Sequence, residues 1–367
     1  MIAEKLAWMR GYIQREEGDV PGTQTALYRL TDLINAGLIP TSIGRPFLFD
    51  AGLLDMVFAL IWADDHATTN EELEAKFEEC EGFVVFMHGW TGNHAIWESI
   101  PGMTVVSNKK LIAITVDHNG FGASLLVDET PPLDKCNPPA AMNTIENLID
   151  VLQLRRQPGQ RSPKVINFVG HSMGGAALFY LNPLRWRMGE ETRLALAPAL
   201  LLDDDTKRIF FTAVGLGIGI VNRLHIFEVF ERFLKPQVIE AVCSGASYYV
   251  KELHRYQYQH TPRGITASTF LAMGLLNNRE IPRQFDFFKT MLGHRDTLVG
   301  LVPMMDLLSR LEFPASNVRV VAGSHYMFSV GPDAVFQHAQ NRELVVQDVL
   351  TLHAAAYLRQ RIGVRIG

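Results

Sequence analysis

From residue 83 onward, short runs of mostly apolar residues alternate with stretches that have helical periodicity. The first three runs are residues 83–87, 111–116 and 165–169. Continuous apolar runs of this length are typical of strands that are buried on both faces of a parallel sheet. Between the second and third runs, residues 141–154 carry apolar side chains at helical spacing. This alternation predicts an α/β fold: a mostly parallel central sheet flanked by helices, with right-handed crossovers.

The alternation is interrupted between residues 201 and 285. A fourth apolar run, residues 194–202, precedes the interruption, and the strand pattern resumes at residues 285–292 and 318–321. The intervening segment contains many Phe and Tyr residues, some at helical spacing. We therefore predict a helical insertion over residues 201–285 in an α/β core of residues 81–200 and 286–367. The predicted core ends with a helix over residues 343–359, and a further helix over residues 301–311 separates the last two strands.

Residues 1–80 are predicted to form an N-terminal helical extension. Apolar residues recur at helical spacing in 2–13 and 27–38. Asp50 is a candidate cap for a third helix over residues 53–61, and Asn70 for a fourth. The apolar run at residues 56–62 is short enough to be a strand instead, because periodicity does not separate the two possibilities at this length.

The composition excludes several classes of protein. The 367 residues include 34 basic and 39 acidic side chains, which gives a net charge of −5 and makes a nucleic acid an unsuitable main partner. A hydrophobic content of 47% excludes wholesale disorder. Three widely spaced cysteines and an N-terminus that lacks a signal-peptide pattern favour a cytoplasmic location. No apolar stretch reaches the length of a membrane span. No histidine spacing indicates a metal site, and no cofactor is expected.

The motif with the clearest chemical meaning is Gly170-His171-Ser172-Met173-Gly174-Gly175. It directly follows the apolar run 165–169 and directly precedes a stretch compatible with a helix. A serine on such a strand–turn–helix is exposed above the edge of the sheet, and the flanking glycines remove side chains that would collide there. The backbone N–H of Met173 is then a natural donor to an oxyanion.

This motif resembles the nucleophile elbow of the α/β-hydrolase superfamily, and two further motifs fit the same resemblance. His88-Gly89-Trp90 follows the first apolar run, and residues 117–124 match the family's Asp-x-x-Gly-x-Gly-x-Ser loop. The resemblance implies that the N–H of Trp90 is the second oxyanion donor and that the 117–124 loop is structural. Three residues near the motif are expected to contact substrate: His88, Gly89 and His171.

In this family the nucleophile is followed along the chain by an acid and then by a histidine. Asp296 follows the run 285–292, and His325 follows the run 318–321. The resemblance therefore implies a catalytic triad of Ser172, His325 and Asp296. The alternative acid is one of three consecutive aspartates at 203–205, which we expect to be a solvated loop or helix cap. The remaining histidines carry no motif, or flank the site as structural contacts.

The resemblance implies a serine hydrolase that cleaves a hydrophobic carboxylic ester, lactone or thioester, and it implies that the helical insertion at 201–285 is a lid over the site. Two alternatives stay open: a carbon–carbon hydrolase of the kind that acts on ring-cleavage products, and a non-hydrolytic ligand-binding protein or cyclase. The expected partner is a small hydrophobic substrate, with no nucleic acid and no membrane span. A homo-oligomer contact through the N-terminal extension or the lid is also possible in this scheme.

Overall fold

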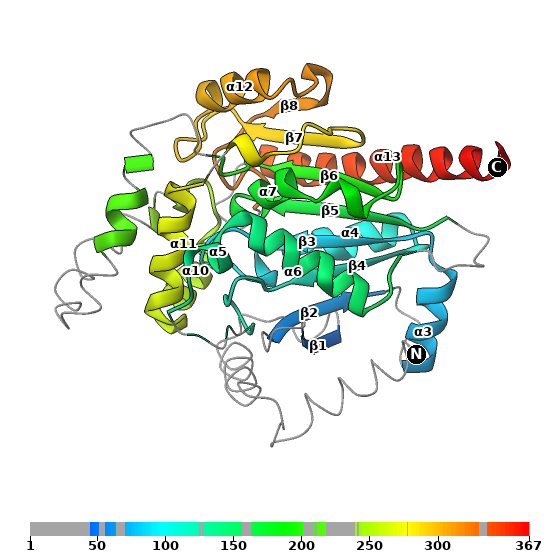
Figure 1. Cartoon of the computed structure of the whole chain (residues 1–367), viewed down its shortest axis with the longest axis horizontal. Helices are drawn as coiled ribbons and strands as arrows, with labels where there is room; N and C mark the ends of the chain where they lie inside the picture. Colours follow the sequence, from blue (N-terminus) through cyan, green and yellow to red (C-terminus); the bar gives the residue numbers. More distant parts are fainter. Residues whose placement is uncertain are drawn as a thin grey trace.

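The computed structural model of the chain is shown in Figure 1. It describes residues 45–50, 56–63, 70–124, 126, 128, 130–155, 163–200, 208, 209, 211–217, 239, 240, 242–276, 278–329 and 336–366. Among these residues, no helix is both long enough and apolar enough to cross a membrane.

The core of the fold is one eight-stranded sheet in the order β1-β2-β4-β3-β5-β6-β7-β8. The strands are β1 (Arg45–Asp50), β2 (Met56–Trp62), β3 (Gly82–Met87), β4 (Leu111–Val116), β5 (Val165–His171), β6 (Glu191–Leu196), β7 (Phe288–Gly293) and β8 (Val318–Val321). The six strands from β4 to β8 pair in parallel, whereas β1 pairs with β2, and β2 with β4, antiparallel. In the centre of the sheet, Val85 of β3 lies between Ile114 of β4 and Phe168 of β5. The predicted α/β fold with a mostly parallel sheet is thus confirmed.

Helices cover both faces of this sheet (Figure 1). The α-helices are α3 (Asn70–Glu79), α4 (Ile100–Ser107), α5 (Leu133–Cys136), α6 (Pro138–Val151), α7 (Met173–Ala177), α10 (Tyr248–His260), α11 (Arg263–Gly274), α12 (Leu301–Arg310) and α13 (Phe336–Ile366). Short 3-10 helices are η1 (His94–Trp97), η2 (Leu178–Tyr180), η3 (Pro183–Arg185), η4 (Asn278–Glu280) and η5 (Ala315–Asn317). Helices α4 and α13 pack together on one face, and α6 packs with α7 on the other.

Strand β2 takes the place of the helix that was predicted over residues 53–61, and Asp50 is the last residue of strand β1. That prediction is wrong, and the alternative of a strand at 56–62 is right. Within β2, the side chains of Val57, Ala59 and Ile61 are buried. The strand pairs with β1 on one side and with β4 on the other, which fixes its extended conformation. The helix at Asn70 is confirmed as α3, whereas the helices predicted over 2–13 and 27–38 lie outside the described residues.

The fourth predicted strand begins earlier than its apolar run. Strand β6 starts at Glu191, three residues before the run that begins at residue 194. Its first three residues are polar but buried, and the Glu191 carboxylate forms an ion pair with the Arg193 guanidinium, with Oε2 and Nε 3.2 Å apart. A search for apolar runs does not find the start of such a strand, because its charged residues are buried as a pair. Strand β7, in contrast, begins later than its apolar run, at Phe288 rather than at residue 285.

Helices α10 and α11 both belong to the segment predicted as a lid. They lie at the end of the sheet where β3, β4 and β5 finish, on the left of Figure 1. Because the carboxyl ends of parallel strands meet at one edge of the sheet, this is the edge where ligands bind in open α/β folds. The three aspartates at 203–205 lie outside the described residues.

Candidate active site

Ser172 lies on the sharp turn between β5 and α7. Its backbone has φ 55° and ψ −114°, a left-handed conformation that is unusual for a residue with a side chain. The turn is possible because of two glycines. A Cβ on Gly170 would lie 2.3 Å from the carbonyl oxygen of Gly174, and a Cβ on Gly174 would lie 2.4 Å from that of Met87. The sharp turn at Ser172 therefore requires glycine at both positions 170 and 174.

The structure brings together the two other residues of the predicted triad. Asp296 follows β7, His325 follows β8, and His325 Nδ1 lies 2.8 Å from Asp296 Oδ2. The other carboxylate oxygen, Asp296 Oδ1, accepts from the N–H groups of Leu298 (2.9 Å) and Val299 (3.0 Å). Burial alone would raise the pKa of the Asp296 carboxyl. The neighbouring His325, through its charge and its hydrogen bond, together with the two backbone donors, instead lowers that pKa below its ordinary value of 3.8.

The other ring nitrogen of His325 is the one that matters for a proton transfer. The ring is fully buried, and His325 Nε2 has no hydrogen-bond partner among the described residues. Because Nδ1 is held by a carboxylate, the proton of a neutral imidazole resides on Nδ1 and the Nε2 lone pair is left to accept one. A general base requires such a lone pair, and in this structure Nε2 makes no hydrogen bond with Ser172 Oγ.

The loop after β3 contacts the serine turn directly. A Cβ on Gly89 would lie 2.9 Å from Ser172 Cβ and 3.4 Å from Ser172 Oγ, so only glycine fits beside the serine. The two loops are also joined by a hydrogen bond from Gly174 N–H to the His88 carbonyl, at 3.1 Å. Across the described part of the chain, the N–H groups of Trp90 and Met173 have no hydrogen-bond acceptor. Both predicted oxyanion donors are therefore available on loops that touch.

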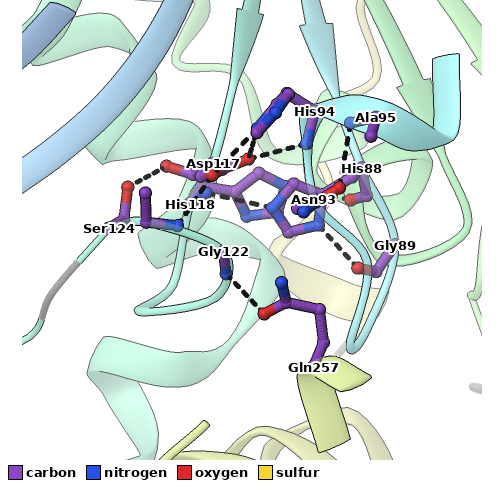
Figure 2. A network of polar contacts seen from close by, with 11 residues as sticks. His88, Gly89, Asn93, His94, Ala95, Asp117, His118, Gly122, Ser124 and Gln257 are labelled. Atoms are coloured by element: carbon purple, nitrogen blue, oxygen red, sulfur yellow. Dashed lines mark hydrogen bonds and ion pairs between the residues drawn. The ribbon is translucent and has the colours of Figure 1, made fainter. Parts of the chain in front are cut away.

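His88 is held by the backbone rather than by the site (Figure 2). The His118 N–H donates to His88 Nε2 at 3.1 Å, which leaves the proton on Nδ1, and Nδ1 donates to the Gly89 carbonyl at 2.7 Å. The rings of His88 and His118 stack, with centroids 4.1 Å apart. Burial, with the neighbouring His118, holds the pKa of His88 well below 6.5. With both ring nitrogens occupied, the substrate contact predicted for His88 is not supported.

The loop at 117–124 is held by the same network. The Asp117 carboxylate accepts from His94 N–H at 2.6 Å and from Ala123 N–H at 2.8 Å. His94 Nδ1 also lies 2.9 Å from Asp117 Oδ1 (Figure 2). Gly122 has φ +61°, and a Cβ there would lie 2.1 Å from Asp117 Oδ2. These contacts join the loops after β3 and β4, which fits the structural role expected for residues 117–124.

His171 packs against the loop that carries His325, the predicted base. Its Nε2 lies 3.1 Å from the carbonyl oxygen of His325, and its ring packs on Tyr326 with centroids 4.3 Å apart. Burial, and the charge of the nearby His325, hold the pKa of His171 well below 6.5. The ring is fully buried and contacts the His325 loop. These contacts support that loop through Nε2, whereas Nδ1 has no hydrogen-bond partner among the described residues, and the substrate contact of His171 stays a prediction.

Helices α10 and α11 contact the loops that carry the predicted site. Phe270 of α11 and Tyr258 of α10 both lie against the Trp90 ring, at centroid distances of 4.3 Å and 6.1 Å. Gln257 Oε1 accepts from Gly122 N–H at 3.1 Å (Figure 2). His254 Nδ1 lies 2.9 Å from Thr91 Oγ1. A single helix, α10, therefore contacts the loops after two neighbouring strands.

Sequence reasoning missed His254, Gln257 and Tyr326. The first two are fully buried in α10 and, with Tyr258, occupy positions i, i+3 and i+4 of one helix face. Polar side chains on the buried face of a helix were the available signal, because buried polar groups need partners elsewhere in the fold. Within the described ranges, no three His, Cys, Asp or Glu side chains gather as a possible metal site.

A profile described as the Alpha/beta hydrolase family matches residues 84–338, more than half of the chain. The chain belongs to the Alpha/beta hydrolase family. The resemblance drawn from the motifs is thereby confirmed, and the expectation of a hydrolase is met at the level of the family. Among curated proteins, no sequence matches this chain.

Solved structures of this fold agree with the family assignment. An esterase from Exiguobacterium antarcticum shares 13% identity with a TM-score of 0.54, covering 82% of this chain and 98% of its own. A thermophilic esterase from Thermogutta terrifontis shares 16% identity with a TM-score of 0.55, covering 83% and 94%. A bromoperoxidase from Bacillus anthracis shares 14% with a TM-score of 0.56, covering 83% and 99%. At such identities the likeness shows a shared fold.

Proposed function

We propose that this α/β hydrolase is a serine hydrolase that cleaves hydrophobic carboxylic esters, lactones or thioesters through an acyl-enzyme on Ser172. The observation that carries the proposal is the buried His325–Asp296 hydrogen bond of 2.8 Å, with His325 Nε2 left without a described partner. A buried histidine oriented by a carboxylate, on the loop that the family uses for its base, has the geometry of the second and third members of a triad.

In the proposed reaction, Ser172 Oγ attacks the carbonyl carbon while His325 Nε2 takes its proton. Asp296 stabilises the resulting imidazolium. The tetrahedral intermediate collapses as His325 returns the proton to the leaving oxygen, and the alcohol departs. A water molecule then attacks the acyl-enzyme with His325 again as base, and the carboxylic acid is released with Ser172 restored.

The proposed oxyanion hole is formed by the N–H groups of Trp90 and Met173. Support comes from the close approach of Gly89, the residue before Trp90, to Ser172, the residue before Met173. The loss of one such donor typically lowers kcat by about 10²–10³-fold. Gly89 and His171 remain predicted substrate contacts, whereas we assign His88 to supporting these loops.

A hydrophobic substrate is favoured by the aromatic side chains next to Trp90. Phe270 stacks on Phe211 with centroids 4.4 Å apart, and both belong to the proposed lid at 201–285. An aromatic surface contributed by this segment suits an apolar acyl or alcohol group. A cytoplasmic location, and a homo-oligomer contact through residues 1–80 or 201–285, stay predictions of the sequence.

The test is hydrolysis of p-nitrophenyl butyrate by the wild type and by Ser172→Ala. We expect the variant to lose about 10⁴–10⁶-fold in kcat, because the nucleophile is removed and only binding and the oxyanion donors remain. Its circular dichroism should match the wild type. Full activity in a folded Ser172→Ala protein would refute the assignment.

The substrate class is tested by comparing kcat/KM for an ester, a lactone, a thioester and a vinylogous diketone. A clear preference for the diketone would favour the carbon–carbon hydrolase. Binding of these compounds without turnover would favour the non-hydrolytic alternative.

A further inference from the structure

His254 of α10 lies between two loops that are far apart in the sequence. Its Nδ1 lies 2.9 Å from Thr91 Oγ1, and its Nε2 is hydrogen-bonded to the Tyr326 hydroxyl. All three side chains are buried. Each of the two loop residues directly follows a residue of the proposed machinery, since Thr91 follows Trp90 and Tyr326 follows His325. One side chain therefore connects the oxyanion loop to the base loop.

The neutral state of the imidazole lets it bond to both hydroxyl groups at once. Burial lowers the pKa of His254 to about 3, and the charge of His325 acts in the same direction, so the ring stays neutral. A neutral imidazole has one N–H donor and one acceptor nitrogen. Because hydroxyl groups both donate and accept, the line from Thr91 through His254 to Tyr326 is fully satisfied with either nitrogen protonated.

Both residues that His254 contacts, Thr91 and Tyr326, are also constrained by their own backbones. Thr91 has φ 51°, a left-handed backbone conformation that a β-branched residue adopts only under constraint from its surroundings. Its hydroxyl contact with His254 supplies such a constraint. At the other end, Tyr326 N–H donates to the Ser244 carbonyl at 2.9 Å, just before α10 begins. The segment that carries His254 is thus attached to the base loop twice.

We propose that His254 is a positioning residue that sets the spacing between the Trp90 N–H and the His325 imidazole. The inference rests on the proposed function, because both of those groups act in the proposed reaction. It adds that the α10 segment is part of the catalytic assembly: the site has its working geometry only while α10 is docked. Reaction geometry is sensitive to such spacing, since a displacement of about 1 Å can cost about 10²-fold in rate.

The experiment measures kcat and KM for p-nitrophenyl butyrate in a double-mutant cycle. His254→Phe keeps a ring in place and removes both hydrogen bonds, and Thr91→Val removes one hydroxyl at nearly constant volume. We expect each variant to lower kcat about tenfold with KM changed less than about twofold, since neither side chain contacts substrate in the proposal. Thr91→Ser, which keeps the hydroxyl, should restore kcat. In the His254→Phe background, Thr91→Val should have no further effect.

The matched control is Gln257→Leu, one turn further along α10. It removes a single buried hydrogen bond from the same helix to the loop at Gly122, which carries no proposed catalytic group. We expect kcat to stay within about twofold of the wild type. An equal loss of kcat in Gln257→Leu would show that any weakening of α10 has this effect, and would overturn the positioning role.

Labelling of Ser172 by a fluorophosphonate separates the two proposals. If wild-type Ser172 is labelled but His254→Phe and Thr91→Val keep full kcat, or if their effects simply multiply, the positioning role is wrong and the hydrolase proposal stands. If wild-type Ser172 is not labelled, both proposals are wrong. If His254→Phe fails to fold, the contrast between Thr91→Val and Thr91→Ser decides the question.

Discussion

Four histidines around the proposed active site are buried as neutral rings, and this makes the stability of the protein depend on pH. Burial lowers the pKa of His118 to about 4 and that of His254 to about 3. It also holds those of His88 and His171 well below 6.5. In the unfolded chain all four return to an ordinary pKa of about 6.5. Below that pH the unfolded state binds more protons, so the free energy of unfolding falls as the pH falls.

The size of the effect follows from these shifts. Each buried neutral histidine removes up to about 1.4 kcal/mol per pH unit between its unfolded and folded pKa values. From pH 7 to pH 5 this amounts to about 2 kcal/mol for each ring, and about 8 kcal/mol for the four. Because a typical free energy of unfolding is about 5–15 kcal/mol, we expect the protein to lose most of its stability over this range.

The assay is urea denaturation followed by tryptophan fluorescence at pH 7, 6 and 5. His118 Nε2 lies 2.9 Å from the His88 carbonyl oxygen. In His118→Gln the amide can donate to the same carbonyl, so this variant should remove about 2 kcal/mol of the pH dependence. The control, His260→Gln, changes an exposed histidine at the end of α10 and should leave the pH dependence as it is. A total loss below about 2 kcal/mol in the wild type would refute the reasoning, because the four rings would then not be held neutral.

Three substitutions test individual contacts of the site. Asp296→Asn removes the charge that stabilises the His325 imidazolium and should lower kcat for p-nitrophenyl butyrate by about 10⁴-fold, with unchanged circular dichroism; a loss below about tenfold would remove Asp296 from the triad. Gly122→Ala would place a Cβ 2.1 Å from Asp117 Oδ2 at a residue with φ +61°, and should cost about 3 kcal/mol of unfolding free energy in urea; an unchanged midpoint would contradict this. Gly89→Ala would place a methyl group 2.9 Å from Ser172 Cβ and should lower kcat about 10²-fold with little change in stability, whereas full activity would show that the two loops have room to separate.

The strands that were predicted correctly are those whose residue pattern along the chain directly reflects their burial in the fold. Strands β3, β4 and β5 are buried on both faces, so their apolar runs marked them directly. The contact between Asp296 and His325, 29 residues apart, followed from the order of motifs along the chain.

Other parts were missed because the deciding interaction is distant in sequence. The start of β6 was missed because it contains Glu191 and Arg193. In the sequence these two residues indicate an exposed segment, whereas in the fold they are buried as an ion pair. β2 is a strand because β1 and β4 pair with it, and its own apolar run is equally compatible with a helix. His254 has no motif, since its contacts with Thr91 and Tyr326 arise only when α10 packs on the loops of the sheet.

The most direct test of the central claim is covalent labelling of the wild-type protein with a fluorophosphonate, followed by mass spectrometry of the peptide that contains Ser172. The account predicts a phosphonyl adduct on Ser172, because a serine with His325 as its base attacks phosphorus as it attacks a carbonyl carbon. His325→Ala should slow the labelling, and Ser172→Ala should abolish it. An unmodified Ser172 in folded wild-type protein, or an adduct on a different serine that persists in Ser172→Ala, would contradict the account.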